Sequence, residues 1–108
     1  MIEDISNINS DYKYCKSYNH TLKAKRTILY PKNINELKNI FVYLKSKKKK
    51  FLIRTGNCGH GDKTQLTSSD YVVSLKNLSK IKKINKIKKT ADIEAGASLF
   101  QIFKYLEK

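Results

Sequence analysis

Short runs of β-branched and aromatic residues punctuate this lysine-rich chain of 108 residues. Each run lies between polar or turn-forming residues, and this arrangement is typical of strands in a mixed fold. The runs predict five strands: Thr27–Tyr30, Phe51–Arg54, Tyr71–Leu75, Ile81–Asn85 and Thr90–Ala95.

Two other segments place apolar residues three or four positions apart, which predicts helices with one buried face. The first begins after Asn33, with Glu36 at capping-box spacing, and is expected to fray into the lysine run 45–50. The second begins after Ser98, with Gln101 at the same spacing. The expected buried faces are Ile34, Leu37, Ile40, Phe41 and Leu44 in the first helix, and Leu99, Ile102, Phe103 and Leu106 in the second.

The order of these elements predicts an α+β fold. The first helix would connect two parallel strands as a βαβ unit, and the run that begins at Tyr71 would supply a third strand. Residues 1–24 are polar and weakly patterned, so we expect a loosely ordered lead-in, with the domain at residues 25–108. Because no element follows the second helix, we expect an incomplete fold in which that helix is partly exposed.

The chain has a formal net charge of +14, a property of many nucleic-acid-binding proteins. Only Arg26 and Arg54 are arginines, however, whereas phosphate and base recognition favour the planar guanidinium group. An A/T-rich genome would also raise the lysine, asparagine and isoleucine content of any protein. We therefore do not favour nucleic acid as a partner, and we keep a small basic nucleic-acid- or phosphate-binding module as the alternative function.

Location and redox state follow from what the sequence lacks. It has no apolar stretch of membrane-spanning length, and its N-terminus has no basic and apolar leader. Its two cysteines, Cys15 and Cys58, form no close pair that would predict a disulfide framework. We therefore expect a reduced, cytoplasmic protein without a membrane span.

Three of the four glycines, Gly56, Gly59 and Gly61, lie within six residues directly after the strand Phe51–Arg54. A glycine cluster at the carboxyl end of a strand can present several backbone N–H groups in one concavity, which suits a phosphate or pyrophosphate. The glycine order differs from the Rossmann pattern G-x-G-x-x-G, and no amphipathic helix follows. A plain glycine-rich turn between strands is the structural alternative.

Two further chemistries are possible for this segment in principle, and we favour neither. Gly56 and Gly61 have P-loop spacing, but Asp62 would put a negative charge into the anion cradle. Cys58, His60 and Asp62 could ligate a metal together with Cys15 or His20, yet the C-x-H spacing differs from common zinc modules. Cys58 and His60 also lack an evident third group that would orient a nucleophile pair. We expect no metal and assign no catalytic residue.

Four segments taken together resemble the FAD-binding domain of the vanillyl-alcohol oxidase/p-cresol methylhydroxylase superfamily, the PCMH-type domain. They occur in the order of that domain, and the resemblance covers about residues 25–108. Within the superfamily, the Gly-Asp ending of the glycine segment looks most like the sugar-oxidising branch, which includes decaprenylphosphoryl-ribose oxidases and sugar-lactone oxidases. The segments are Tyr30-Pro31 with Asn35-Glu36-Leu37, Phe51–Asp62, Tyr71–Ile81 and Ile93–Leu99.

The resemblance implies the first subdomain of the FAD-binding fold and the beginning of the second. In the family the glycine loop wraps the FAD pyrophosphate, and the turn like 94–97 leads to a helix beside the cofactor. The substrate domain is absent from this chain, so a missing C-terminal region or a separate chain would complete the protein. The implied cofactor-binding residues are Arg54, Thr55, Gly56, Asn57, Cys58, Gly59, His60, Gly61, Asp62 and Gly96.

The implied function is the FAD-binding portion of an oxidoreductase that acts on an alcohol or sugar CH–OH group. Some family members attach the flavin through a histidine of this loop. When the loop is aligned with the family at Arg54, His60 takes the position of the attaching histidine. When it is aligned at Gly61 and Asp62, Cys58 takes that position, so the register of the loop stays open. The second count leads us to expect non-covalent FAD, since nothing nearby favours a Cys58 thiolate.

Overall fold

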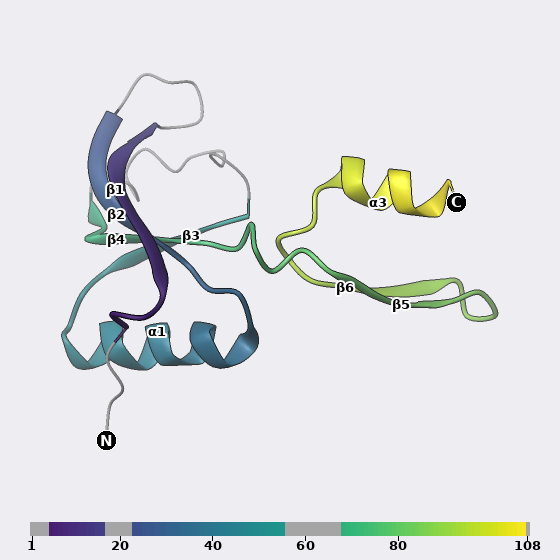
Figure 1. The fold of residues 1–108 in the computed structure, drawn as a ribbon, viewed down its shortest axis with the longest axis horizontal. Helices are drawn as coiled ribbons and strands as arrows, with labels where there is room; N and C mark the ends of the chain where they lie inside the picture. The colour runs from purple at the N-terminus through teal and green to yellow at the C-terminus, as the bar shows by residue number, and fades with distance from the viewer. Residues whose placement is uncertain (1–4, 17–22, 56–67, 108) are drawn as a thin grey trace.

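The computed structural model describes residues 5–16, 23–55 and 68–107 of the chain. These residues form two lobes that are joined by a narrow connection (Figure 1). The first lobe contains a four-stranded sheet and helix α1 (Ile34–Ser46). The second contains the hairpin of β5 (Ile81–Asn85) and β6 (Thr90–Ile93), followed by helix α3 (Leu99–Leu106). The α+β class predicted from the sequence is confirmed.

The sheet of the first lobe has the strand order β1-β2-β4-β3. Its strands are β1 (Asn9–Lys16), β2 (Lys23–Tyr30), β3 (Phe51–Arg54) and β4 (Tyr71–Ser74). Both β2 and β3 pair with β4 in parallel. Helix α1 therefore connects two parallel strands as predicted, and the third strand, β4, lies between them.

Strand β1 lies in the segment that we expected to be loosely ordered, so this expectation is wrong for Asn9–Lys16. The strand pairs antiparallel with β2 over its whole length, from Asn9 opposite Tyr30 to Lys16 opposite Lys23. It is an edge strand, where polar and charged side chains are common, and its sequence therefore lacks the apolar run that identifies an interior strand. The division of the chain into a lead-in at 1–24 and a domain at 25–108 stays a prediction.

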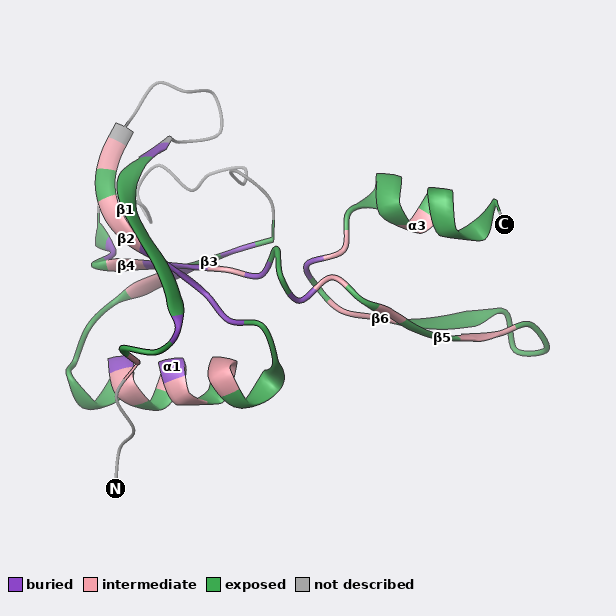
Figure 2. Ribbon diagram, in the orientation of Figure 1, coloured by how far each residue is buried: buried purple, intermediate pink, exposed green. Residues whose placement is uncertain are grey.

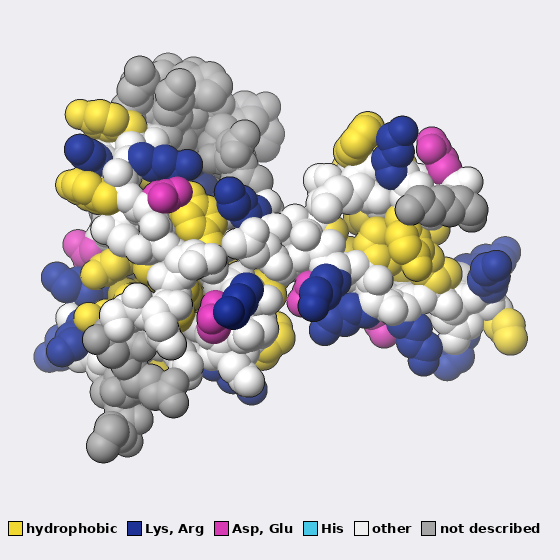
Figure 3. Space-filling view, viewed as in Figure 1, with side chains coloured by type: hydrophobic (Ala, Val, Ile, Leu, Met, Phe, Trp, Pro, Cys, Tyr) yellow, Lys and Arg dark blue, Asp and Glu magenta, His cyan; other side chains and the backbone are white. Residues whose placement is uncertain are grey.

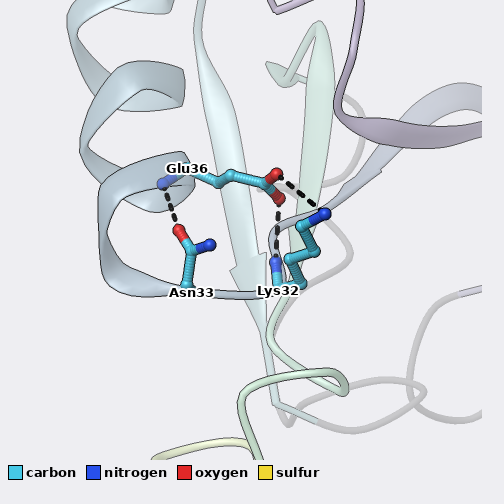
Figure 4. Close-up of polar contacts among 3 residues, drawn as sticks. All are labelled: Lys32, Asn33 and Glu36. Atoms are coloured by element: carbon cyan, nitrogen blue, oxygen red, sulfur yellow. Dashed lines mark hydrogen bonds and ion pairs between the residues drawn. The ribbon is translucent and has the colours of Figure 1, made fainter.

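The N-terminus of α1 has the predicted cap with one difference (Figure 4). The Asn33 side chain accepts a hydrogen bond from the backbone N–H of Glu36, at 2.8 Å. The Glu36 carboxylate accepts one from the backbone N–H of Lys32 at 3.0 Å, one residue before the cap, and lies 3.9 Å from the Lys32 ammonium. The cap satisfies backbone donors that the helix leaves unpaired and so determines where α1 begins.

The C-terminus of α1 ends in a defined motif and does not fray into the lysine run. The N–H of Lys48 donates to the carbonyl of Lys45, and the N–H of Lys49 donates to that of Leu44. These two bonds form a Schellman motif. Lys48 adopts φ 55, the left-handed conformation for which this motif normally uses glycine.

The core of the first lobe consists of two clusters, one on each face of the sheet, because successive strand residues alternate in direction. Helix α1 packs on one face through Ile40 and Leu44, with Leu37 and Phe41 partly buried, whereas Ile34 is exposed against expectation. We call the opposite side of the sheet, which points away from α1, the far face. Its buried cluster is Cys15, Ile28, Tyr30, Leu52 and Val72.

The second lobe has almost no core. Helix α3 has no buried residue, although its capping box of Ser98 and Gln101 forms as predicted. The contrast with the sheet of the first lobe is clear in Figure 2. Leu99 and Phe100 are each 70% exposed, and Phe103 and Leu106 are also exposed. The apolar face of α3 that the sequence predicted is present, but of its four residues Ile102 is half-buried and Leu99, Phe103 and Leu106 are exposed.

Candidate functional site

The carboxyl ends of three parallel strands meet at one edge of the four-stranded sheet. Arg54 at the end of β3 lies opposite Ser74 of β4, and Leu29 of β2 lies opposite Val73. The glycine segment 56–61 begins two residues after β3, so it starts at this edge. Ligands of open parallel sheets bind at the carboxyl ends of the strands, and this edge is therefore the candidate site.

The described side chains of this edge are neutral or basic. Tyr30, Thr55 and Ser74 are neutral, and Arg54 and Lys76 carry positive charge. The Lys76 ammonium lies 4.7 Å from the ring centroid of Tyr30, within range of a cation–π interaction. No carboxylate occurs at the described ends of the three parallel strands, residues 29–31, 54–55 and 74–77, and the carboxylate near them is Asp11 of β1, a neighbour of the Tyr30 hydroxyl. The edge therefore suits a negatively charged ligand.

Arg54 and Thr55 are the members of the predicted loop site that the structure describes. The Arg54 side chain is only 8% exposed and lies on the far face with Leu52, two residues earlier on β3. Its backbone carbonyl accepts a hydrogen bond from the N–H of Leu75 at 2.9 Å, which ties β3 to the chain just after β4. Thr55 is exposed at the start of the glycine segment.

Seven predicted cofactor-binding residues lie outside the described residues, and their roles stay predictions. The P-loop alternative and the metal-site candidate His20 also fall on residues that are not described. Among the residues that the structure does describe, no group of three His, Cys, Asp or Glu side chains could hold a metal ion. The seven residues are Gly56, Asn57, Cys58, Gly59, His60, Gly61 and Asp62.

Gly96, the last predicted site residue, is buried where the two lobes join. Its N–H donates to the carbonyl of Leu78 at 2.8 Å. A methyl group added at Gly96 would overlap the Leu75 carbonyl and lie 2.6 Å from the Leu78 carbonyl oxygen. The close approach of two backbone segments explains the glycine at this position. This packing does not depend on a cofactor, and the contact between Gly96 and a cofactor stays a prediction.

The far face carries three basic residues that the sequence did not group. Lys13 of β1 lies directly opposite Arg26 of β2 in the antiparallel register. Lys13 shares its face of β1 with Cys15, and Arg26 shares its face of β2 with Ile28. Arg54 lies on the same side of the sheet. The sequence signal is that Arg26 and Arg54 are the chain's two arginines, but only the strand register shows that they share a face.

Two titratable groups lie among these cations. Burial raises the pKa of the Cys15 thiol, while the positive charges of Arg54, Lys13 and Arg26 act in the opposite direction. Burial also raises the pKa of the Tyr30 hydroxyl, whose neighbours Lys13 and Asp11 act in opposite directions. Both groups are therefore neutral at physiological pH, and the charge of the far face comes from Lys13, Arg26, Arg54 and Asp11.

The described ranges contain no helix with the length and apolar character needed to cross a membrane.

Comparison with known proteins then provides independent information on the fold. A family described as FAD binding domain matches residues 26–108. No curated protein matches the chain.

Among solved structures, the chain is similar to the crystal structure of cholesterol oxidase from B. sterolicum. The TM-score is 0.75 at 15% sequence identity, and the match covers 99% of this chain and 22% of that one. At this identity the likeness shows the fold. The chain therefore spans about a fifth of the length of the oxidase that it resembles.

Proposed function

Because the chain belongs to the FAD-binding domain family, we propose that it forms the phosphate-holding part of an FAD-dependent oxidoreductase that acts on an alcohol or sugar CH–OH group. The PCMH-type fold expected from the sequence is confirmed by the family match and by the likeness to cholesterol oxidase. The comparisons lend no support to the alternative of a nucleic-acid-binding module.

The observation that carries the proposal is the carboxyl-end edge of the sheet. Three parallel strands end there, the glycine segment starts there, and the described side chains of the edge are neutral or basic. A pyrophosphate carries negative charge on several oxygens, and it requires N–H donors with little competing negative charge. The residues present therefore fit the pyrophosphate of FAD.

Each part of the chain has a role in this proposal. The backbone N–H groups of segment 56–61 bind the pyrophosphate, and the small glycine residues allow close approach. Arg54 and Thr55 position the start of that segment at the end of β3. FAD, when bound, would supply hydride-accepting chemistry for the substrate CH–OH group, and in this proposal residues outside this chain contact the substrate. The chain itself thus binds and orients the cofactor.

In this proposal a further polypeptide region completes the domain. The α3 face is exposed, and the match covers 22% of cholesterol oxidase. Hydrophobic side chains gather between α3 and the hairpin in Figure 3, and Ile81, Phe100 and Tyr105 line an open groove of about 420 Å³ there. We propose that either a C-terminal continuation or a separate chain covers this face and encloses FAD between the two parts.

The finer assignment follows the resemblance of the glycine segment. Its Gly61-Asp62 ending favours the sugar-oxidising branch, with decaprenylphosphoryl-ribose and sugar-lactone oxidases as the nearest kinds of enzyme. The same ending favours the register in which Cys58, not His60, takes the position of flavin attachment. We propose that FAD is bound without a covalent bond, because a thiol must ionise before it reacts.

The test compares two kinds of variant in equilibrium dialysis against FAD, with the completed protein. Gly59→Val or Gly61→Val should abolish flavin binding, since a side chain would keep the phosphate away from the backbone. Replacement of Lys47–Lys50 by serine is the matched control and should leave binding unchanged, although it removes four positive charges. Equal losses in both variants would show that general positive charge, and not the glycine segment, binds the ligand.

The linkage is tested by acid precipitation of the flavin-loaded protein. We expect all flavin fluorescence in the supernatant. Fluorescence that stays in the pellet and disappears in His60→Ala would show a histidyl bond, and would contradict the register proposed here.

A further inference from the structure

The β5–β6 hairpin ends in a projecting turn that carries an exposed isoleucine. The turn consists of residues 86–89 and lies at the end of the molecule remote from the four-stranded sheet (Figure 1). Ile87 is 94% exposed, the largest exposed fraction among the large apolar side chains that the structure describes. Single apolar residues on a surface are common, so the exposure of Ile87 has meaning only together with its surroundings.

The turn holds Ile87 in a defined position. The Asn85 side chain accepts hydrogen bonds from the backbone N–H groups of Ile87, at 3.1 Å, and of Lys88, at 3.0 Å. Lys89 then adopts φ 57, and the chain continues into β6. Asparagine side chains commonly order a turn through such local bonds. Because the turn is ordered already, Ile87 loses little conformational freedom when it contacts a partner.

Positive charge surrounds this apolar tip. Residues 82–92 include five lysines, all exposed, and one carboxylate, that of Asp92. Lysine and arginine side chains are prominent along the hairpin in Figure 3. Ile87 itself lies between two of the lysines in the chain. The hairpin therefore presents an apolar tip within a cationic surface. The five are Lys82, Lys83, Lys86, Lys88 and Lys89.

We propose that the turn 86–89 binds the surface of an anionic phospholipid bilayer, with Ile87 inserted below the headgroups and the neighbouring ammonium groups at the lipid phosphates. Lysine side chains can extend along apolar surface while their ammonium groups stay at headgroup level. Lysines near an anionic membrane and a buried apolar side chain both strengthen such attachment.

The chemistry of the hairpin favours a lipid surface over nucleic acid. The segment from Ile81 to Ile93 has no arginine, which base and phosphate recognition favour, and no aromatic side chain on which a base could stack. A bilayer requires neither, because it is attracted by charge and accepts an aliphatic side chain. The inference goes beyond the proposed function, and it does not use the apolar face of α3.

The composition of the chain permits a direct test by fluorescence. The chain has no tryptophan, so Ile87→Trp places a single reporter at the tip. The 108-residue protein is mixed with vesicles of phosphatidylcholine and phosphatidylserine in a ratio of two to one. We expect the emission to move to shorter wavelength with these vesicles and to stay unchanged with phosphatidylcholine alone. Val42→Trp, at a position of α1 that is 52% exposed, is the matched control and should show no shift.

Sedimentation with the same vesicles measures how much each group contributes. Ile87→Ser should weaken partition about tenfold, equivalent to about 1.4 kcal/mol. Glutamine at Lys86, Lys88 and Lys89 together should weaken it about a hundredfold, since each lysine near an anionic surface strengthens binding roughly fivefold. Glutamine at lysines 48–50 is the matched control, because each triplet removes three charges and includes one residue with left-handed backbone. The control should change partition little.

Three results would overturn the inference. They are an unchanged emission of Ile87→Trp, an equal shift in Val42→Trp, and equal weakening by the two lysine triplets, which would show attraction by general positive charge. Binding of duplex DNA that the hairpin triplet weakens, without partition of the protein into vesicles, would overturn it in favour of nucleic acid.

Discussion

Individual residues of this protein show where backbone geometry takes precedence over side-chain preference. Lys48 and Lys89 adopt φ values of 55 and 57, which are unfavourable for residues with a Cβ atom. Gly96 shows the opposite case, since any side chain there would overlap the backbone of Leu75. The lysine-rich composition of the chain explains why lysine occupies the two left-handed positions. The close approach of two backbone segments requires glycine at position 96.

Lys48→Gly should therefore stabilise the protein. Glycine removes the strain of the left-handed conformation at the end of α1, and the expected gain in the free energy of unfolding is about 1 kcal/mol. Lys47→Gly is the matched control, because Lys47 has φ −88 and would gain nothing while losing the same charge. Urea denaturation measures both variants. A destabilised Lys48→Gly protein would show that the Schellman geometry does not form.

Cys15 predicts a specific dependence of stability on pH. Its pKa is raised from 9.0 by burial, so the folded protein holds the thiol proton more tightly than the unfolded chain does. This contribution is fully present below pH 9 and is lost as the pH rises through the folded-state pKa. Unfolding free energy should fall more steeply above pH 9 in the wild type than in Cys15→Ala. Parallel pH profiles for the two proteins would contradict the burial of this thiol.

At the scale of elements, the two lobes differ in how much apolar surface they bury. Strands β2 and β4 are central to the sheet and contribute to clusters on both faces. The hairpin of β5 and β6 is two-stranded, and α3 buries no residue. Two-stranded sheets and short isolated helices are marginal in water. The second lobe should accordingly open far more often than the first.

Amide hydrogen exchange should reveal this difference residue by residue. Amides of α3 and the β5–β6 hairpin should exchange at least tenfold faster than those of β4, because local opening there exposes little buried surface. Ser98→Ala, which removes a helix cap, should speed exchange within α3 and leave β4 unchanged. Equal protection in α3 and β4 would mean that the exposed face is covered in solution.

The elements also show what sequence patterns can predict. Asn33 and Ser98 marked both helix starts, since caps are local interactions and need no knowledge of the fold. Strand β1 was missed because its partner β2 and its edge position, not an apolar run, determine it. The association of Lys13 with Arg26 was missed for the same reason, because register between strands is a tertiary property.

At the scale of the whole molecule, we propose that this chain is the phosphate-binding part of a larger FAD-binding unit. The sheet edge and the glycine segment are present in this chain, whereas α3 and the hairpin have an unburied apolar face. The first lobe should thus bind the phosphate portion of FAD, and the flavin ring should find few contacts. The isolated chain should therefore bind FAD weakly, with a dissociation constant on the order of 1 mM or one to two orders of magnitude below that.

The most direct measurement is equilibrium dialysis of FAD against the isolated 108-residue chain, with ADP and riboflavin as competitors. We expect weak, saturable FAD binding that ADP displaces and that riboflavin, which has no phosphate, leaves unchanged. A protein that emerges from gel filtration with stoichiometric yellow flavin would contradict the need for a second half. Displacement of FAD by riboflavin, or no saturable binding at any concentration, would contradict the phosphate-holding role itself.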